Sequence, residues 1–323
     1  MQIKTDRRYK DFKIIFECIS GSHLYGVDTP ESDVDIRGVF IPPKEYLLGF
    51  LHRVEQIEEH KQDVVHYDFR KFMKLAADCN PNIVELLFVP ENSWQITSPE
   101  WATIITNRHL FLSTKARWTF SGYATSQLHR IKGHRNWLLN PPKKIPERED
   151  FDLPRHTKMN RDILNEVETS YKIDLSKQDL PEEVAEVLPP NIITIIRNEK
   201  RYQNAMRDWK QYQNWKATRN PDRAKLEEAY GYDTKHGSHL YRLVTEGEEF
   251  LTTGYITFPR PDREIILDIR NGRYSYDQLL EKVGDIDQRF EPLYENSPLP
   301  HKAKLEDIDT LCINLAQQHL FGG

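Results

Sequence analysis

The sequence has few cysteines, only Cys18, Cys79 and Cys312 in 323 residues. Because they are widely separated and odd in number, a disulfide framework or a cysteine-based zinc site is not expected. Long apolar runs are also missing, since none approaches the roughly 20 residues of a membrane helix. The opening residues MQIKTDRRYKDF lack the apolar core of a signal peptide. We therefore expect a cytoplasmic protein without a membrane partner.

The chain also lacks an overall excess of positive charge. Its 45 Lys and Arg are outnumbered by 50 Asp and Glu, a net charge of -5, so bulk charge does not indicate a nucleic-acid binder. The distribution is more informative, because residues 115–146 contain seven Lys or Arg and no acid. This stretch predicts a local anion-binding patch.

Aromatic residues are interleaved with those cations, as in surfaces that stack bases and follow a phosphate backbone. We take Arg130, Lys132 and Arg135, which flank a single glycine, as candidate contacts to an RNA end. The alternative is that the aromatics are core residues and the cations are merely solvated.

Hydrophobic and turn patterns predict an N-terminal α/β region and a helical remainder. The first region reads as four strands over 12–20, 34–41, 53–57 and 63–67, with helices over 69–78 and 82–88. Helices are expected over 100–112, 116–131, 191–218, 222–230, 234–251, 275–290 and 304–319. Short acidic helices are expected in 161–188, an exposed loop over 140–160, and a hairpin of 255–259 with 263–270. The predicted fold class is α+β, with a small core in residues 1–112 followed by a mainly helical domain in 113–323.

The chemistry is concentrated in residues 21–38, GSHLYGVDTPESDVDIRG. Asp33 and Asp35 are two apart on the second predicted strand, so both side chains should leave one face of it. Two adjacent carboxylates repel each other unless a cation lies between them. Their oxygens suit Mg²⁺, which proteins commonly hold with one or two carboxylates plus substrate phosphates. A pair of such ions can clamp an in-line phosphoryl transfer.

Gly21 and Ser22 directly follow the first predicted strand. Glycine allows a tight turn and a close approach of the backbone to a ligand. A serine hydroxyl and backbone amides at a helix start can hold phosphate oxygens. The sequence therefore places a phosphate-binding turn about a dozen residues before the acidic pair, and a nucleoside triphosphate needs both.

The Gly-Ser turn followed by SDVD on the next strand resembles the DNA polymerase β nucleotidyltransferase superfamily. The longer stretches GSHLYG, ESDVDIRGVF, DVVHYDFRKFMKLAADCNPNIVELLF and YDTKHGSHLYRLV are similar to its RNA-repair-associated branch, predicted nucleotidyltransferases found beside RNA ligases. The resemblance covers residues 13–90 and, more loosely, 113–140 and 228–272. It implies a polymerase β-type core with a mixed sheet.

The resemblance also implies a role for each matching residue. Gly21 and Ser22 would hold the β- and γ-phosphates, and Asp33 and Asp35 would bind two Mg²⁺ or Mn²⁺ ions. A third carboxylate from a later strand would complete the metal set, and Asp63 is our candidate.

Nearby groups have simpler interpretations. Asp68 fits a helix N-cap, and His66 fits a packed or hydrogen-bonding histidine. Glu85 is expected on a helix surface or packed against Asn80 or Asn82.

Three cations are further candidates for nucleotide contacts. Arg37 lies on the predicted carboxylate face, where it could touch phosphate or pair with Asp35. Lys235 and Arg242 share one face of a predicted helix with His239, and the resemblance favours both as contacts to the triphosphate or base. An ordinary solvated basic face is the alternative.

These features favour an enzyme that transfers a nucleoside monophosphate from a nucleoside triphosphate to an RNA end, with tRNA as a candidate and an RNA ligase as a candidate partner. Pyrophosphate would be released. Two alternatives stay open. One is transfer to a protein hydroxyl, as in toxin–antitoxin nucleotidyltransferases, and the other is a nucleotide- or RNA-binding module without chemistry.

Overall fold

The computed structural model describes residues 11–30, 32–59, 63–155, 165, 169–170 and 190–322. Within them the chain divides into two compact units, residues 1–132 with 226–323 and residues 133–225. These units do not follow the expected boundary between residues 112 and 113. The short acidic helices expected in 161–188 fall, apart from three residues, outside the described residues.

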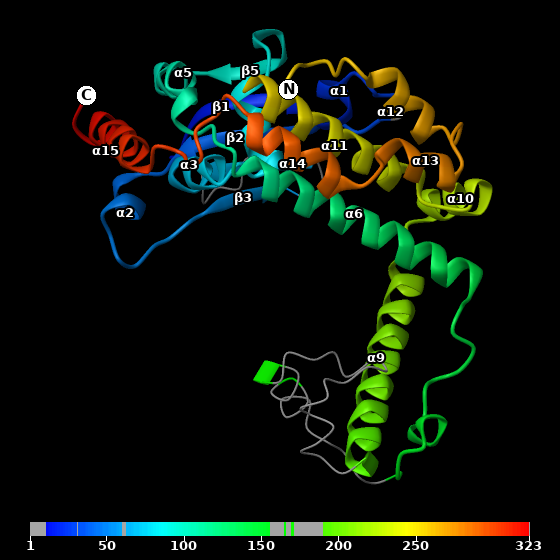
Figure 1. Cartoon of the computed structure of the whole chain (residues 1–323). Helices are drawn as coiled ribbons and strands as arrows, with labels where there is room; N and C mark the ends of the chain where they lie inside the picture. Colours follow the sequence, from blue (N-terminus) through cyan, green and yellow to red (C-terminus); the bar gives the residue numbers. More distant parts are fainter. Residues whose placement is uncertain are drawn as a thin grey trace. The chain divides into compact units, whose positions relative to one another are not determined.

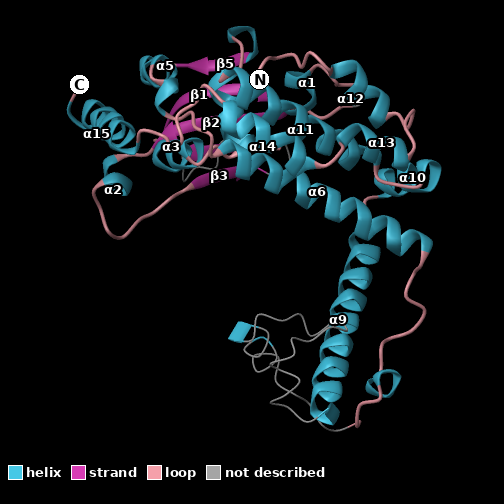
Figure 2. Ribbon diagram, in the orientation of Figure 1, coloured by secondary structure: helices cyan, strands magenta, loops and turns pink. Residues whose placement is uncertain are grey.

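The first unit contains a five-stranded sheet with the order β3-β4-β2-β1-β5. Only β2 and β4 pair in parallel, and the other neighbours are antiparallel, so the sheet is mixed as expected. Figure 2 shows the strands as one magenta layer with helices packed around it. The strands are β1 (Lys13–Ser20), β2 (Asp35–Ile41), β3 (Gln56–Glu59), β4 (Val64–Asp68) and β5 (Trp94–Thr97).

Short helices connect and cover the strands. Helix α1 follows β1 without a linker, and α3 begins directly after β4, where the Asp68 carboxylate accepts a hydrogen bond from the Arg70 backbone N–H as a helix cap. These elements are α1 (Gly21–Tyr25), α2 (Lys44–Leu47), α3 (Phe69–Ala77), α4 (Pro81–Val84), η2 (Glu85–Phe88), η3 (Glu91–Ser93), α5 (Pro99–Thr106) and η4 (Arg108–Leu110).

The C-terminal helices belong to the same unit as the sheet. Helix α11 is in contact with α12, α13 and α14, and the four run together in Figure 1. Their bounds, with those of α15, are α11 (Thr234–Thr253), α12 (Arg263–Arg270), α13 (Tyr276–Val283), α14 (Ile286–Asn296) and α15 (Leu305–Phe321). One hydrophobic core extends from Ile15 in β1 to Leu315 in α15, so these helices and the sheet bury each other.

The second unit is built on α9 (Pro190–Thr218), with η5 (Arg148–Phe151) held against it. Arg148 makes two hydrogen bonds of 3.0 and 2.8 Å to the buried Glu199 carboxylate. Helix α6 (Ala116–Leu139) and helix α10 (Pro221–Tyr230) each contribute residues to both units. No helix among the described residues has the length and apolarity needed to cross a membrane.

The expected hairpin of 255–259 with 263–270 is wrong. Residues 255–262, all of them described, contain no strand, and 263–270 form helix α12. Ile266 and Ile269 are the buried members of the apolar run, and their spacing of three places both on one helix face. The expected helix over 275–290 is two helices separated at Gly284, whose φ of +63° ends α13.

Candidate active site

The site lies where three chain segments meet, at one end of the inner strands β4, β2 and β1. Strands β2 and β4 are parallel neighbours, so Asp35 at the start of β2 and Asp63 just before β4 come together at the same end. Strand β1 is antiparallel to β2 and pairs Ser20 with Asp35, which brings Gly21 to that end. The Ile36 N–H donates to the Asp63 carbonyl over 3.1 Å and fixes this register.

Asp35 and Asp63 form a hydrogen-bonded carboxyl pair. Burial, followed by the hydrogen bond and charge of Asp63, raises the pKa of Asp35 to about 6. The same hydrogen bond is the main reason that the pKa of Asp63 lies below its ordinary value. The pKa values of the two carboxyl groups are therefore pushed apart, as expected for two carboxylates in contact.

Position 21 requires glycine because the Asp35 side chain lies directly against its backbone. Its φ is +63°, in the left-handed region that favours glycine. A Cβ atom built on Gly21 would overlap the Asp35 carboxylate. The turn before α1 and the acidic pair are therefore in direct contact, and Ser22, the next residue of α1, is half-buried.

Two cations lie close to the pair. The Arg37 guanidinium is 3.1 Å from a carboxylate oxygen of Asp63 and 3.6 Å from one of Asp35, and it also donates to the Asp63 carbonyl over 2.7 Å. Lys235, exposed in the first turn of α11, lowers the pKa of both carboxyl groups through its charge. Together they partly neutralise the acidic pair from two sides.

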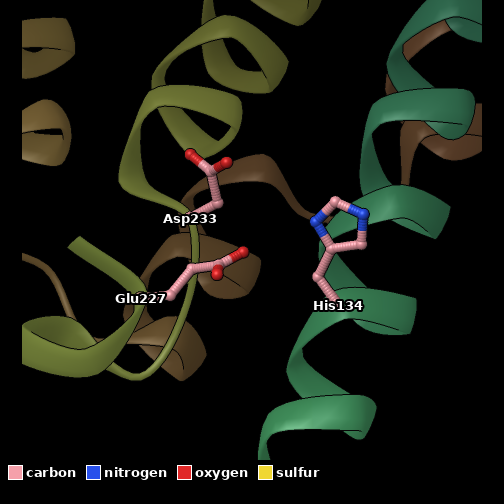
Figure 3. A group of neighbouring side chains, drawn as sticks. All are labelled: His134, Glu227 and Asp233. Atoms are coloured by element: carbon pink, nitrogen blue, oxygen red, sulfur yellow. The ribbon is translucent and has the colours of Figure 1, made fainter. Parts of the chain in front are cut away.

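The start of α11 is itself held in place. Figure 3 shows Asp233 in the turn ahead of this helix and Glu227 on α10. The Asp233 carboxylate accepts a hydrogen bond of 3.0 Å from the His236 backbone N–H, which caps α11. The third side chain in the view, His134, belongs to the second unit. Because the cap fixes the first turn of α11, it also fixes the backbone position of Lys235.

Asp33 lies outside β2, so the strand alternation expected to align it with Asp35 does not reach it. Strand β2 begins at Asp35, because its ladder partner Ser20 is the last residue of β1. No strand partner is left for the preceding residues, and Val34 is 46% exposed. Asp33 therefore lies in the connection before β2, exposed to solvent, while Asp35 pairs with Asp63.

Arg242 occupies a different position from the one expected of a nucleotide contact. It is 5% exposed, and its guanidinium lies 2.5 Å from Glu246 and 3.3 Å from Glu85. A cation buried between two carboxylates is held by them rather than presented to a ligand. Of the two helix cations predicted, Lys235 is the one whose charge lowers the pKa of both Asp35 and Asp63.

Glu85 was expected on a helix surface, and this is wrong as well. It is 3% exposed and accepts a hydrogen bond of 2.9 Å from the Tyr25 hydroxyl. Its position inside the apolar run IVELLF is the signal for a buried, paired carboxylate. His66, in contrast, is buried and hydrogen-bonded to Glu17 over 2.8 Å, as predicted.

The three candidate RNA contacts all lie on α6. Arg130 and Lys132 are exposed in the first unit, and Arg135 is half-buried in the part of α6 that belongs to the second unit. Two aromatic residues of the same stretch, Trp118 and Tyr123, are 59% and 36% exposed, whereas Phe120 is fully buried.

The five-stranded mixed sheet followed by helices is consistent with the polymerase β-type core that the sequence resemblance implies. Residues 1–141 match the RNA repair pathway DNA polymerase beta family (RlaP), which covers the whole sheet and α6. This part of the chain is therefore similar to that family.

Similar chains come from distant organisms. A 38.9 kDa protein encoded in the nrdC-mobD intergenic region of Enterobacteria phage T4 is 28% identical over 86% of this chain and 89% of its own length. The protein YcgL of Bacillus subtilis is 31% identical over 27% of this chain and 34% of its own. The protein MJ0002 of Methanocaldococcus jannaschii is 27% identical over 44% and 53%, respectively. All three are described as uncharacterized, and no solved structure matches the chain.

Proposed function

We propose that the chain is a metal-dependent nucleotidyltransferase that transfers a nucleoside monophosphate from a nucleoside triphosphate to an RNA end. A hydroxyl of the acceptor attacks the α-phosphorus, the bond to the β-phosphate oxygen breaks, and pyrophosphate leaves. The hydroxyl proton passes to a nearby base. The observation that carries this proposal is the Asp35–Asp63 pair lying directly against Gly21.

The donor set fits Mg²⁺ or Mn²⁺. Two carboxylates in contact repel each other when both are ionised, and a hard divalent cation between their oxygens relieves that repulsion. Two such ions would supply charge neutralisation at the attacking and leaving oxygens. Asp35 and Asp63 would hold them, and Asp33, in the segment that leads into Asp35, completes the proposed set.

The remaining residues have positioning roles in this proposal. The backbone at Gly21 and the Ser22 hydroxyl hold the β- and γ-phosphates, opposite Lys235 at the start of α11. Arg37 bridges Asp35 and Asp63 and so fixes their orientation, and a contact of Arg37 to phosphate stays a prediction. Holding the polyphosphate and the acceptor in line is the main contribution a protein makes to phosphoryl transfer.

The decisive test replaces the carboxylates one at a time by isosteric amides. Asp35→Asn and Asp63→Asn are expected to lower pyrophosphate release by at least about a hundredfold, because loss of one preorganised charge in a site commonly costs 10²–10³ in kcat. Asp33→Asn tests whether the exposed third carboxylate takes part. Asp277→Asn, an exposed residue of α13, is the matched control. Unchanged product from Asp35→Asn would contradict the metal site.

An RNA acceptor is supported by the exposed cations of α6 together with the family's description as an RNA repair pathway family. Joint replacement of Arg130, Lys132 and Arg135 by Gln is expected to abolish RNA labelling and to reduce the salt dependence of RNA binding. Each lost phosphate contact should lower the slope of log K against log salt by about 0.7 for a single strand. Arg130→Lys is the charge-preserving control.

A different result would identify another acceptor or none. Triphosphate turnover that survives the triple replacement, with label appearing on protein, would favour transfer to a protein hydroxyl. Triphosphate binding that is insensitive to Mg²⁺, without turnover, would favour a binding module. A screen of all four triphosphates with total RNA and nicked tRNA identifies the substrate pair, and an RNA ligase acting on the extended end is the proposed partner.

A further inference from the structure

A buried cluster of four polar side chains connects α1 to the C-terminal helices. The Tyr25 hydroxyl donates to Glu85 over 2.9 Å, and the Arg242 guanidinium lies 4.0 Å from the Tyr25 ring centroid. Arg242 also contacts Glu85 and Glu246, at 3.3 and 2.5 Å. Glu85, Arg242 and Glu246 are at most 5% exposed, and they come from η2 and α11.

Such a cluster is expensive, and its cost calls for a role beyond stability. Burying ionised groups costs several kcal/mol per ion, and apolar packing of similar volume is often equally stable. Two carboxylates here share one guanidinium, and the Glu246 Oε1 atom has no hydrogen-bond partner among the described residues. Instead, the cluster fixes the placement of α1 relative to α11, because its contacts can all be made in only one arrangement of the two helices.

The cluster is connected to the Gly21–Ser22 turn through Tyr25. Tyr25 ends α1, which begins at Gly21 and contains Ser22. Two further contacts hold the same end of α1: the Arg260 N–H donates to the Tyr25 carbonyl over 3.1 Å, and Arg270 donates to the Val27 carbonyl over 3.0 Å. The far end of α1 is thus attached to the region that follows α11 as well as to α11 itself.

Helix α11 contains both Arg242, which belongs to the cluster, and Lys235, which acts on the acidic pair. Lys235 and Arg242 are seven residues apart, about two turns, and so lie on one side of the helix. The charge of Lys235 acts on the carboxylate pair, whereas Arg242 contacts Tyr25. One rigid helix therefore sets the distance between the cation at the acidic pair and the helix that follows Gly21.

We propose that Tyr25, Glu85 and Arg242 are positioning residues that hold the Gly21–Ser22 turn and Lys235 at the separation a triphosphate requires. The inference rests on the proposed function for the identity of the ligand. The ordering of α1 by the cluster can be measured without any ligand.

The first experiment removes one hydroxyl from the full-length chain. Tyr25→Phe keeps the ring under Arg242 but loses the bond to Glu85. The matched control is Tyr232→Phe, which loses an equally buried hydroxyl bond, 2.9 Å to the Tyr274 carbonyl, away from α1. The reporters are the Gly26 and Val27 amides, which donate to the His23 and Ser22 carbonyls. We expect their hydrogen exchange to accelerate about tenfold in Tyr25→Phe and to be unchanged in Tyr232→Phe.

The second measurement is binding of a non-hydrolysable Mg²⁺-triphosphate by calorimetry. Tyr25→Phe is expected to weaken binding about three- to tenfold, the cost of one lost hydrogen bond in the held conformation. KM for the triphosphate should rise by a similar factor while kcat falls less. Arg242→Lys, which keeps the charge but loses the planar stacking on Tyr25, should show the same pattern and keeps the test available if Tyr25→Phe folds poorly.

The outcomes separate this inference from the proposed function. Unchanged amide exchange at Gly26 and Val27 overturns the inference, and so does faster exchange with unchanged triphosphate affinity in an active protein. Weaker binding in Tyr232→Phe to the same extent also overturns it, because a general loss of stability would then explain the effect. A wild-type chain that neither binds nor turns over any triphosphate contradicts the proposed function, while the exchange result still decides whether the cluster orders α1.

Discussion

Close contact between a glycine and a carboxylate defines the site at the scale of single residues. Gly21 has a positive φ, and any side chain there would displace Asp35. Asp35 in turn lies against Asp63, beside Arg37. A side chain at Gly21 would therefore disturb the contact between the two carboxylates.

Gly21→Ala should lower both stability and activity. The left-handed backbone alone costs an alanine about 1–2 kcal/mol, and the overlap with Asp35 adds to this. Gly231→Ala is the matched control, because Gly231 has a φ of +75° with no atom within 4 Å of an added Cβ. Denaturant unfolding of both variants isolates the contact with Asp35. Equal losses in the two would show that Asp35 does not constrain Gly21.

Residue-level prediction succeeded where the signal was local. The cap at Asp68 and the hydrogen-bonded His66 follow from residue type and immediate neighbours. Arg242 looks like part of an exposed basic helix face, and the apolar neighbours of Glu85 indicate burial but not its partner. Only their meeting across 157 positions of sequence buries them as a pair.

At the scale of elements, α3 and the site strand β4 join at Asp68. Its carboxylate is 2% exposed and accepts hydrogen bonds from the Arg70 backbone and from its guanidinium at 2.9 and 2.6 Å. Asp63, at the other end of β4, has a carboxylate that is 56% exposed. Asp68, at the end of β4, therefore stabilises the fold. Asp63, just before β4, is exposed and available for the proposed chemistry.

This division predicts opposite effects for two substitutions. Asp68→Ala should reduce the free energy of unfolding by about 1–2 kcal/mol, a typical loss of a cap, and leave turnover nearly unchanged. Asp63→Asn should abolish turnover and change stability little. Asp68→Asn, which retains a capping oxygen, is expected to recover most of the stability. Loss of turnover in a folded Asp68→Asn protein would instead assign Asp68 to the site.

Element types were predicted best where periodicity was strong. The helix at 191–218 and the strands at 12–20 and 63–67 appear within two residues of their expected bounds. Strand β5 was missed because its four residues are largely exposed at the sheet edge, and its pairing with β1 is the only signal. The apolar residues of 263–270 favour a strand by composition, but the buried ones, Ile266 and Ile269, have the spacing of a helix face.

For the whole molecule, stability should depend on pH through the buried cluster. Burial is the main reason that the pKa of Glu85 is raised from 4.5 to about 7. The folded state then binds an extra proton between these pH values, so Glu85 makes stability fall as pH rises from about 4.5 to about 7. Below that range its contribution is fully present, and above it the loss is complete.

Glu85→Gln should remove this dependence, because the amide cannot ionise. The difference in unfolding free energy, wild type minus Glu85→Gln, is expected to fall across that range by at most about 1.4 kcal/mol per pH unit. Denaturant unfolding at several pH values provides the measurement, with the exposed Glu264→Gln as control. Parallel curves for wild type and Glu85→Gln would show that Glu85 does not titrate differently on folding.

The sequence by itself determined the local structure of this protein: the tight turn at Gly21, the helix caps and most helices. These depend on interactions within a few residues. Tertiary structure decided that Asp35 pairs with Asp63, that Arg242 is buried with Glu85, and that the C-terminal helices share one core with the sheet. Strand pairing and burial join segments far apart in the chain, and local patterns carry no information about which of them meet.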